Sequence, residues 1–342
     1  MTKTKPRVVY TDPRWAVTAD GKVDLALGDI EREVYGEAVD LEFGIYENGR
    51  FVTEGPRLVE RLRGASAVLV LRTQIDAPVI DVLAPTCRVV GRQGVGYDNL
   101  DLLELERRGI LAFNVPDYCT SEVSDHALAL ILALERRIVL QNAQIKSGRW
   151  KTEDAPIHRR LGNLTFGIVG LGRIGRAVAR KAAAFYGTLQ AYDPYVSVDG
   201  MAGLGVRKCA NLTELLATSD VVTVHAPLSP QTHFLIGRAD LPAIKPGALL
   251  INTARGNLVE PEAVLEALES GRLGGYGSDV FTPEDPNEHP VNRRIIAFDN
   301  VVVTPHSAFR SADAIRSVRR RVSEEIRRVL VDGEPPRFGR LV

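Results

Sequence analysis

A glycine-rich turn between an apolar run and a helical segment constrains the fold of this chain more than any other feature. The run Leu164–Val169 leads directly into Gly170-Leu171-Gly172-Arg173-Ile174-Gly175. In a turn from strand to helix, the first glycine permits the tight turn, the second lets a ligand approach the backbone, and the third lets helix and strand pack closely. The pattern predicts a dinucleotide pyrophosphate at the N-terminus of that helix, with glycines that serve packing alone as the alternative.

An acidic residue about 20 positions past the glycines supports the nucleotide interpretation. Asp193 directly follows the expected strand Thr188–Tyr192. A carboxylate there can accept hydrogen bonds from the 2′- and 3′-hydroxyls of an adenosine ribose, and its charge would repel a 2′-phosphate. We therefore expect NAD rather than NADP, with a simple turn aspartate before Pro194 as the alternative.

Short β-branched runs alternate with helical segments on both sides of a long central helix. The first set of strands is expected at Arg7–Thr11, Val39–Ile45, Ala67–Arg72, Cys87–Arg92 and Leu111–Val115, with helices at Gly55–Arg63, Pro78–Leu83 and Asp101–Arg108. The second set is expected at Leu164–Val169, Thr188–Tyr192, Val206–Lys208, Val221–Val224, Ala248–Asn252, Gly275–Val280 and Val301–Thr304. An amphipathic C-terminal helix is indicated by apolar residues three or four apart, namely Ile315, Val318, Val322, Ile326 and Val329. This alternation predicts an α/β protein with two doubly wound parallel sheets.

The long helix between the two sets is expected to span Ser121–Gly148. Ser121-Glu122-Val123-Ser124 is typical of a helix start, and Gly148 is a stop signal. Apolar residues cover more than one face of this segment, which predicts burial. Burial in the core of a monomer and burial in a homodimer interface both satisfy the pattern.

The composition excludes several classes of protein. Among 342 residues, Lys and Arg number 43 and Asp and Glu number 43, so the formal net charge is zero and no nucleic-acid or basic membrane-binding surface is indicated. Cys87, Cys119 and Cys209 are scattered, which predicts buried thiols in a reducing compartment rather than disulfides or a metal site. There is no apolar leader and no run of 18 apolar residues, so we expect a cytoplasmic protein.

Three residues near the ends of the second set of strands are suited to moving a proton beside a bound substrate. Arg255 follows the strand Ala248–Asn252, and its guanidinium can grip a carboxylate and polarise a neighbouring carbonyl. His306 follows the last strand, and an imidazole can give or take a proton near neutral pH. Glu284 lies between them, and a carboxylate beside an imidazole stabilises the imidazolium and orients the ring. Each residue taken alone also fits a simpler role, as a surface ion pair, a structural histidine or a solvated acid.

With these residues placed, the chain from about Val68 to Leu330 resembles the D-isomer-specific 2-hydroxyacid dehydrogenase family. The motifs that carry the resemblance occur in the family's order: GRQGVGYDNLDL, GLGRIG with Asp193, DVVTVHAPLSPQT, GALLINTARGNLVE, GSDVF with the following glutamate, and VVVTPH. The segment TPHSAF, with the aromatic Phe309, is most similar to the branch of C-terminal binding corepressors.

The resemblance implies a particular architecture. A flavodoxin-like substrate-binding domain, residues 1–119 and 307–342, would hold an inserted Rossmann NAD-binding domain, residues 120–306. The active site would lie in the cleft between them, closure would exclude water, and the Ser121–Gly148 region would contribute to a homodimer.

The resemblance also implies roles for individual residues. Arg255 would bind and polarise the substrate, His306 would be the acid/base, and Glu284 its partner. NAD would be contacted by Gly170, Gly172, Arg173, Ile174, Gly175, Asp193, His225, Ala226, Pro227, Thr253 and Asp279, with no acid/base role for His225. The substrate would be bound by Arg72, Val95, Gly96, Arg255 and Phe309.

The function expected from these assignments is NAD-dependent interconversion of a small-molecule 2-oxo acid and a D-2-hydroxy acid by hydride transfer. An NAD-sensing, corepressor-like binding protein and a dehydrogenase acting on phosphite or a phosphonate are the alternatives. The sequence leaves open whether the far end of the substrate is hydrophobic, as Phe309 favours, or anionic, as Arg72 and Arg310 favour.

Overall fold

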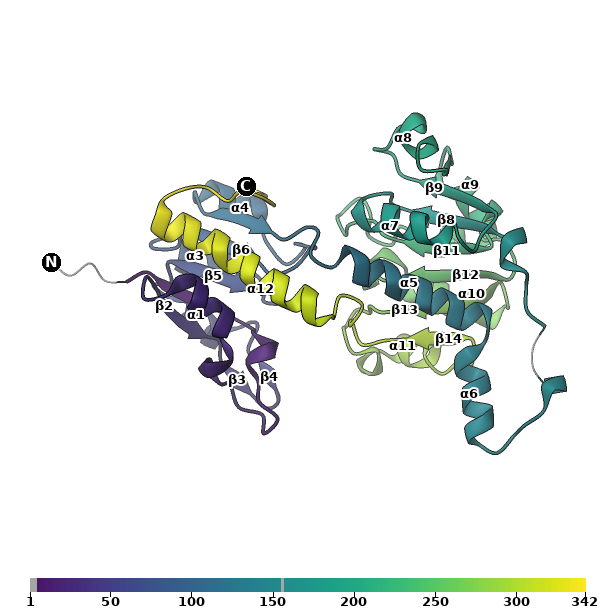
Figure 1. The fold of residues 1–342 in the computed structure, drawn as a ribbon, viewed down its shortest axis with the longest axis horizontal. Helices are drawn as coiled ribbons and strands as arrows, with labels where there is room; N and C mark the ends of the chain where they lie inside the picture. The colour runs from purple at the N-terminus through teal and green to yellow at the C-terminus, as the bar shows by residue number, and fades with distance from the viewer. Residues whose placement is uncertain (1–4, 155–156) are drawn as a thin grey trace. The chain divides into compact units, whose positions relative to one another are not determined.

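The computed structural model describes residues 5–154 and 157–342, and the chain divides into two compact units. The first unit comprises Met1–Tyr118 and Ser311–Val342, and the second comprises Cys119–Arg310 (Figure 1). The C-terminal segment thus returns to the unit in which the chain begins.

The first unit is built around a five-stranded parallel sheet with the order β2-β1-β5-β6-β7. Its strands are β1 (Arg7–Tyr10), β2 (Asp40–Phe43), β5 (Ala67–Val70), β6 (Val89–Arg92) and β7 (Leu111–Asn114). Its helices are α1 (Asp29–Tyr35), α2 (Pro56–Leu62), α3 (Ala77–Leu83), α4 (Leu102–Arg107) and α12 (Ala312–Arg327), which continues as a π-helical turn at Arg328–Asp332. The strand order is that of a flavodoxin-like sheet, as predicted. A small antiparallel pair, β3 (Tyr46–Glu47) and β4 (Arg50–Phe51), was not predicted.

The predicted apolar stripe of the C-terminal helix is what joins α12 to this unit. Val318, Val322 and Ile326 are buried in one core with Val8 and Phe113. The helix packs against α1 and β6, so the C-terminal helix of the chain lies beside a helix from its N-terminal part (Figure 1).

The second unit contains a seven-stranded parallel sheet with the order β10-β9-β8-β11-β12-β13-β14. Its strands are β8 (Thr165–Val169), β9 (Thr188–Tyr192), β10 (Arg207–Lys208), β11 (Val221–Val224), β12 (Ala248–Asn252), β13 (Leu273–Ser278) and β14 (Val301–Val303). Its helices are α5 (Thr120–Glu135), α6 (Ile138–Lys146), α7 (Arg173–Ala182), α8 (Val198–Ala202), α9 (Leu212–Thr218), α10 (Pro261–Glu269) and α11 (Pro290–Ile295).

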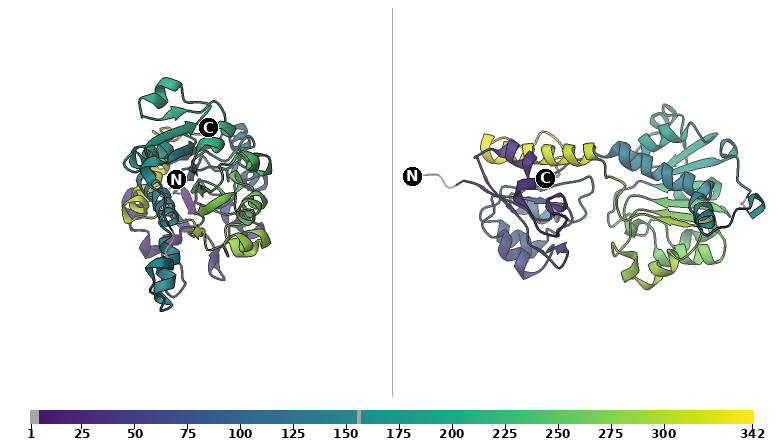
Figure 2. Two further views of the ribbon diagram at one scale, coloured as in Figure 1. Left: turned by 90° about the vertical axis from the view of Figure 1, so that its right-hand side faces the viewer. Right: turned by 60° about the horizontal axis from the view of Figure 1, so that its bottom comes forward.

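Two cores cover the two faces of this second sheet. One buries α5 and α7 through residues such as Ile131 and Val178, and the other buries α9 and α10 through residues such as Leu215 and Val264. Figures 1 and 2 show these helices in separate layers on either side of the strands. The unit is therefore doubly wound, as predicted, and its strand order reverses beside β8, where ligands bind in such sheets.

The prediction of one continuous helix over Ser121–Gly148 is wrong. The helix is interrupted at Arg137, whose φ of 51° lies in the left-handed region, so that α5 and α6 are separate. Within the single chain, α5 is buried, whereas no residue of α6 is buried and Ile138 and Ile145 are 53% and 48% exposed. Burial in the core of a monomer is therefore wrong for α6, and burial in a homodimer interface stays a prediction.

Cys87, Cys119 and Cys209 are buried, as predicted. Burial raises the pKa of the Cys87 thiol to about 12. Over the two described ranges, no helix has the length and apolarity needed to cross a membrane. No cluster of three or more His, Cys, Asp or Glu side chains suited to a metal ion occurs in the same part of the chain.

Candidate active site

The three glycines of the loop after β8 differ in whether a side chain at their position would clash with neighbouring atoms. Gly170 has φ +88°, and a Cβ there would lie 2.8 Å from the backbone nitrogen of Ala226. A Cβ on Gly175 would lie 2.1 Å from the Gly170 carbonyl oxygen. A Cβ on Gly172, the N-cap of α7, would meet no atom within 4 Å, and the φ angle of Gly172 is not positive. Packing explains the first and third glycines, whereas the second leaves open room above the helix N-terminus, where a pyrophosphate would fit.

Asp193 ties the end of β9 to the glycine loop. Its Oδ2 accepts a hydrogen bond from Leu171 N at 2.8 Å, and its Oδ1 accepts one from Tyr195 N at 2.9 Å. A carboxylate has about four acceptor sites, so acceptor capacity is left for the hydroxyls of a ribose.

The segment after β11 lies against the glycine loop and contains a neutral histidine. His225 N donates to Val169 O at 2.7 Å, and its Nε2 lies 2.9 Å from Thr223 Oγ1. Burial lowers the pKa of His225 from 6.5 to about 4. The imidazole is therefore uncharged at neutral pH. Ala226 and Pro227 continue this segment at the carboxyl edge of the sheet.

The loop after β12 presents Arg255 and a buried hydroxyl. Asn252, fully buried, holds the loop by donating from Nδ2 to Arg255 O at 2.8 Å and accepting from Ala254 N at 3.1 Å. Arg255 Nη1 donates to Ala254 O at 2.8 Å. Thr253 is 7% exposed, and its Oγ1 has no hydrogen-bond partner among the described residues. A buried polar atom without a partner is costly, so the residues fit a site in which a bound molecule supplies one.

The imidazole of His306 and the carboxylate of Glu284 are in contact. His306 Nδ1 lies 2.9 Å from Glu284 Oε1 and 3.0 Å from Oε2. An ionised carboxylate only accepts, so Nδ1 carries the hydrogen, and Nε2 is the ring nitrogen turned away from Glu284. His306 has φ 50°, a left-handed conformation that costs energy in residues other than glycine and is frequent at functional sites.

Asp279, 1% exposed, holds the backbone on which His306 is mounted. Its carboxylate accepts from Thr304 Oγ1 at 2.5 Å and from the backbone nitrogens of Ser307 and Ala308, each at 2.9 Å. Its carbonyl oxygen accepts from His306 N at 2.8 Å. We predicted a contact with NAD for Asp279, and the structure assigns it this supporting role within the loop, which the sequence did not indicate.

Phe309 lies beside the imidazole. Its ring centroid is 6.2 Å from that of His306, and the two planes meet at 88°. The edge-to-face arrangement places an apolar wall next to the proton-carrying ring.

The remaining substrate-binding candidates belong to the first unit. Arg72 follows β5, and its backbone nitrogen donates to the buried Asp12 at 2.6 Å. Val95 and Gly96 follow β6, and Val95 O accepts from Asn114 Nδ2 at 2.6 Å. These residues lie at the carboxyl edge of their own sheet, whereas Arg255, Glu284 and His306 lie at that of the second unit.

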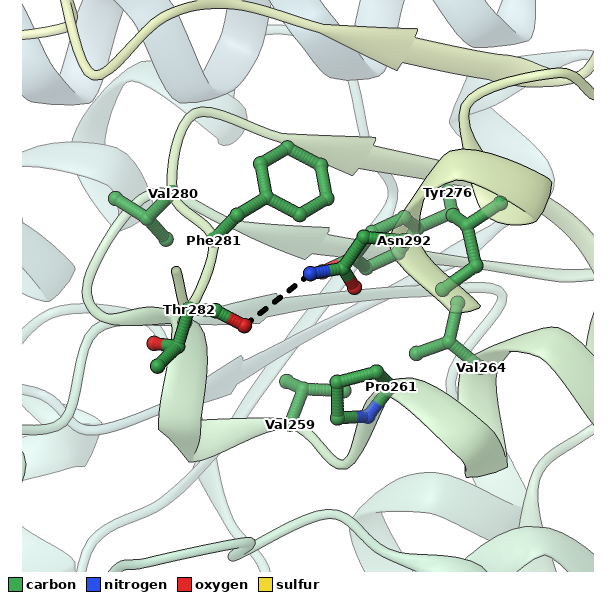
Figure 3. A pocket seen from close by; sticks show the side chains of 10 residues that line it. Val259, Pro261, Val264, Tyr276, Val280, Phe281, Thr282 and Asn292 are labelled. Atoms are coloured by element: carbon green, nitrogen blue, oxygen red, sulfur yellow. Dashed lines mark hydrogen bonds between the residues drawn. The ribbon is translucent and has the colours of Figure 1, made fainter. Parts of the chain in front are cut away.

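A small cavity lies beneath the loop that leads to Glu284 (Figure 3). It is lined in part by Tyr276, Phe281 and Thr282, and Asn292 Nδ2 donates to Thr282 O at 3.2 Å across it. Its volume of about 10 Å³ admits roughly one water molecule, so it is a packing feature and does not hold a substrate.

Fold and site together define a class of protein. The second unit is a doubly wound domain with a glycine loop after β8, and it carries an imidazole–carboxylate pair and an arginine at the carboxyl edge of its sheet. Residues 128–308 match the family model described as D-isomer specific 2-hydroxyacid dehydrogenase, NAD binding domain. The chain belongs to the D-isomer specific 2-hydroxyacid dehydrogenase family, as the motifs indicated.

Relatives of known name support this membership. The chain is 35% identical over 275 residues to the D-3-phosphoglycerate dehydrogenase of Methanocaldococcus jannaschii, a match covering 80% of this chain and 51% of that protein. It is 38% identical over 275 residues to the glyoxylate reductase of Korarchaeum cryptofilum, covering 79% and 81%. The chain thus spans about half the length of the phosphoglycerate dehydrogenases that it matches.

The fold is also shared with solved structures. The D-lactate dehydrogenase of Aquifex aeolicus, complexed with NAD and lactic acid, superposes with a TM-score of 0.82 at 26% identity. The match covers 96% of each chain.

Proposed function

We propose that this protein is an NAD-dependent dehydrogenase that interconverts a 2-oxo acid and a D-2-hydroxy acid. The observation that carries the proposal is the contact of His306 Nδ1 with the Glu284 carboxylate in the same unit as the glycine loop. Family membership and the named relatives support the same reaction. The second unit would be the NAD-binding domain and the first the substrate-binding domain.

NAD would be held by residues around the glycine loop. The N-terminus of α7, at Gly172, Arg173 and Ile174, would receive the pyrophosphate, and Asp193 would accept from the ribose. The unpartnered hydroxyl of Thr253 would gain a hydrogen bond. When bound, the nicotinamide supplies or accepts a hydride.

The acid/base step would fall to His306. With Nδ1 directed at Glu284, the proton on Nε2 is available to the carbonyl oxygen of a 2-oxo acid, and the same nitrogen would take it back in the reverse direction. The Glu284 carboxylate stabilises the imidazolium and fixes its orientation. Arg255 would bind the substrate carboxylate and polarise the adjacent carbonyl.

The other substrate contacts are also part of the proposal. Backbone N–H groups of Val95 and Gly96 would hold the carboxylate, Arg72 would reach the far end of the substrate, and Phe309 would form an apolar wall. Small 2-oxo acids are the substrate class that these contacts support.

The proposal is tested by measuring whether the protein reduces 2-oxo acids with NADH. Purified protein with NADH is offered glyoxylate, hydroxypyruvate and branched 2-oxo acids, and loss of NADH absorbance is followed. We expect one or more to be reduced, and His306→Ala to abolish the reaction while NADH binding persists. Well-folded protein that reduces none of these acids would contradict the proposal, and reduction of NAD in the presence of phosphite would favour the phosphorus alternative. None of the relatives and structures reported above is named as a corepressor.

We further infer that the protein is a cytoplasmic homodimer. Ile138, Val139 and Ile145 of α6 are about half exposed, at 53%, 50% and 48%, and Trp150 just beyond is 82% exposed. Apolar side chains gathered on one short segment are typical of a surface that a second subunit covers. The buried thiols support a reducing compartment.

A further inference from the structure

A chain of hydrogen bonds runs from the helix α5 to the loop that carries His306. His126 Nε2 lies 2.8 Å from Thr304 Oγ1, and Thr304 Oγ1 lies 2.5 Å from Asp279 Oδ1. The three residues come from α5, from the segment after β14 and from the segment after β13, all within the second unit. Neither His126 nor Thr304 has a part in the proposed function.

The direction of each hydrogen bond follows from the hydrogens available. An ionised aspartate only accepts, so the single hydroxyl hydrogen of Thr304 is donated to Asp279. Thr304 Oγ1 must then accept from His126, which requires that His126 Nε2 carry a hydrogen. The chain is therefore directional, from His126 through Thr304 to Asp279, and it selects one tautomer of the imidazole.

The carboxylate at the end of this chain is the one that shapes the His306 loop. The Oδ1 atom that accepts from Thr304 also accepts from Ser307 N, and Oδ2 accepts from Ala308 N. The neighbouring His306 is held at φ 50°. Because such a conformation persists only where its surroundings enforce it, a rotated Asp279 carboxylate would release the loop and displace the imidazole.

We propose that His126 is a positioning residue for His306, acting through Thr304 and Asp279. His126 touches neither substrate nor cofactor in this role. His126 orients the Thr304 hydroxyl, and this hydroxyl holds the Asp279 carboxylate in place. The carboxylate in turn fixes the backbone that determines the direction of the His306 imidazole. The inference rests on the proposed function for its kinetic consequence, although the ordering of the loop does not depend on any reaction.

The kinetic test compares His126→Ala with His126→Gln, which restores an N–H donor. With a 2-oxo acid that the unmodified enzyme reduces, we expect His126→Ala to lower kcat by about tenfold or more, while KM and the dissociation constant of NADH change by less than about twofold. Thr304→Val should have a similar effect, and combining it with His126→Ala should add little, since both break one chain. His126→Gln should recover most of kcat.

The matched control is His158→Ala. His158 is another half-buried histidine of the same unit, and its Nδ1 meets the carbonyl oxygen of Glu135 at 3.0 Å. The His158→Ala substitution should leave kcat unchanged. Equal losses in the two alanine variants, or no recovery with His126→Gln, would overturn the proposal in favour of a purely structural histidine.

A second measurement separates this inference from the proposed function. Hydrogen exchange of the amides of Ser307 and Ala308 should accelerate in His126→Ala and Thr304→Val but not in His158→Ala. If no 2-oxo acid is reduced and exchange still accelerates, the proposed function fails and the positioning role stands. Unchanged exchange at both amides in His126→Ala would refute the positioning role, whatever the enzyme turns over.

Discussion

His306 Nδ1 lies 2.9 Å from Oε1 and 3.0 Å from Oε2 of Glu284, so the imidazole faces both oxygens of one carboxylate. The two residues are 22 positions apart and follow the neighbouring parallel strands β14 and β13. This arrangement leaves Nε2 as the nitrogen that can exchange a proton with a substrate.

The contribution of this contact is testable with Glu284→Gln, which keeps the shape and removes the charge. Reduction requires a proton on Nε2 of a correctly oriented ring, and an uncharged amide holds the Nδ1 hydrogen less strongly than a carboxylate does. We expect kcat/KM for reduction to fall by about tenfold or more near neutral pH. Asp285→Asn is the control, since Asp285 faces Asn287. A Glu284→Gln variant with the kcat/KM of the wild type would contradict the role.

Alanine substitutions at two glycines of the loop should have different effects, one on the stability of the fold and the other on NADH binding. Gly175→Ala places a Cβ 2.1 Å from the Gly170 carbonyl oxygen and should destabilise the protein by about 1–3 kcal/mol. Gly172→Ala meets nothing within 4 Å and should leave the melting temperature unchanged while weakening NADH binding. Thermal melts and NADH fluorescence titrations check both expectations. Tight NADH binding by Gly172→Ala would argue against a pyrophosphate at this position.

The neutral His225 makes stability depend on pH. Its pKa is lowered to about 4 in the folded protein, so the unfolded chain takes up a proton first as the pH falls. The stabilisation is complete above the unfolded pKa of about 6.5 and is lost progressively below it, levelling off near the folded value. Between about pH 7 and pH 5 the unfolding free energy should fall by about 2 kcal/mol more in the wild type than in His225→Asn. Urea unfolding at the two pH values measures the difference, and equal losses would show that His225 is not the group responsible.

The homodimer hypothesis predicts that charges on α6 dissociate the protein. Ile138→Glu combined with Ile145→Glu should convert a dimer into a folded monomer in sedimentation experiments, because two carboxylates would be buried without partners. Leu103→Glu is the control, since Leu103 is 82% exposed in α4 of the first unit. A wild-type monomer, or a variant that stays dimeric, would exclude this interface.

Most of the fold could be predicted because its strands are buried on both faces and read as short β-branched runs. Val221–Val224 and Ala248–Asn252 form strands with the predicted bounds. The pair β3 and β4 escaped prediction because two-residue strands have no periodic pattern. The break between α5 and α6 escaped it because Arg137 adopts a left-handed conformation without a glycine or proline to signal it.

The sequence by itself determined those features whose residues are close together along the chain. The glycine spacing and Asp193 mark the loop and its acid because the turn, the helix start and the next strand end are consecutive in the chain. Motif order also marked Arg255, Glu284 and His306 as a set. Tertiary structure alone decided that Asp279 accepts hydrogen bonds from the backbone of the His306 loop. It also decided that His126 forms a hydrogen bond with Thr304, which is 178 residues away in the chain. The physical reason is that a hydrogen bond depends on direction and on distances of about 3 Å, and only the packing of α5 against the sheet brings residues so far apart in the chain to that separation.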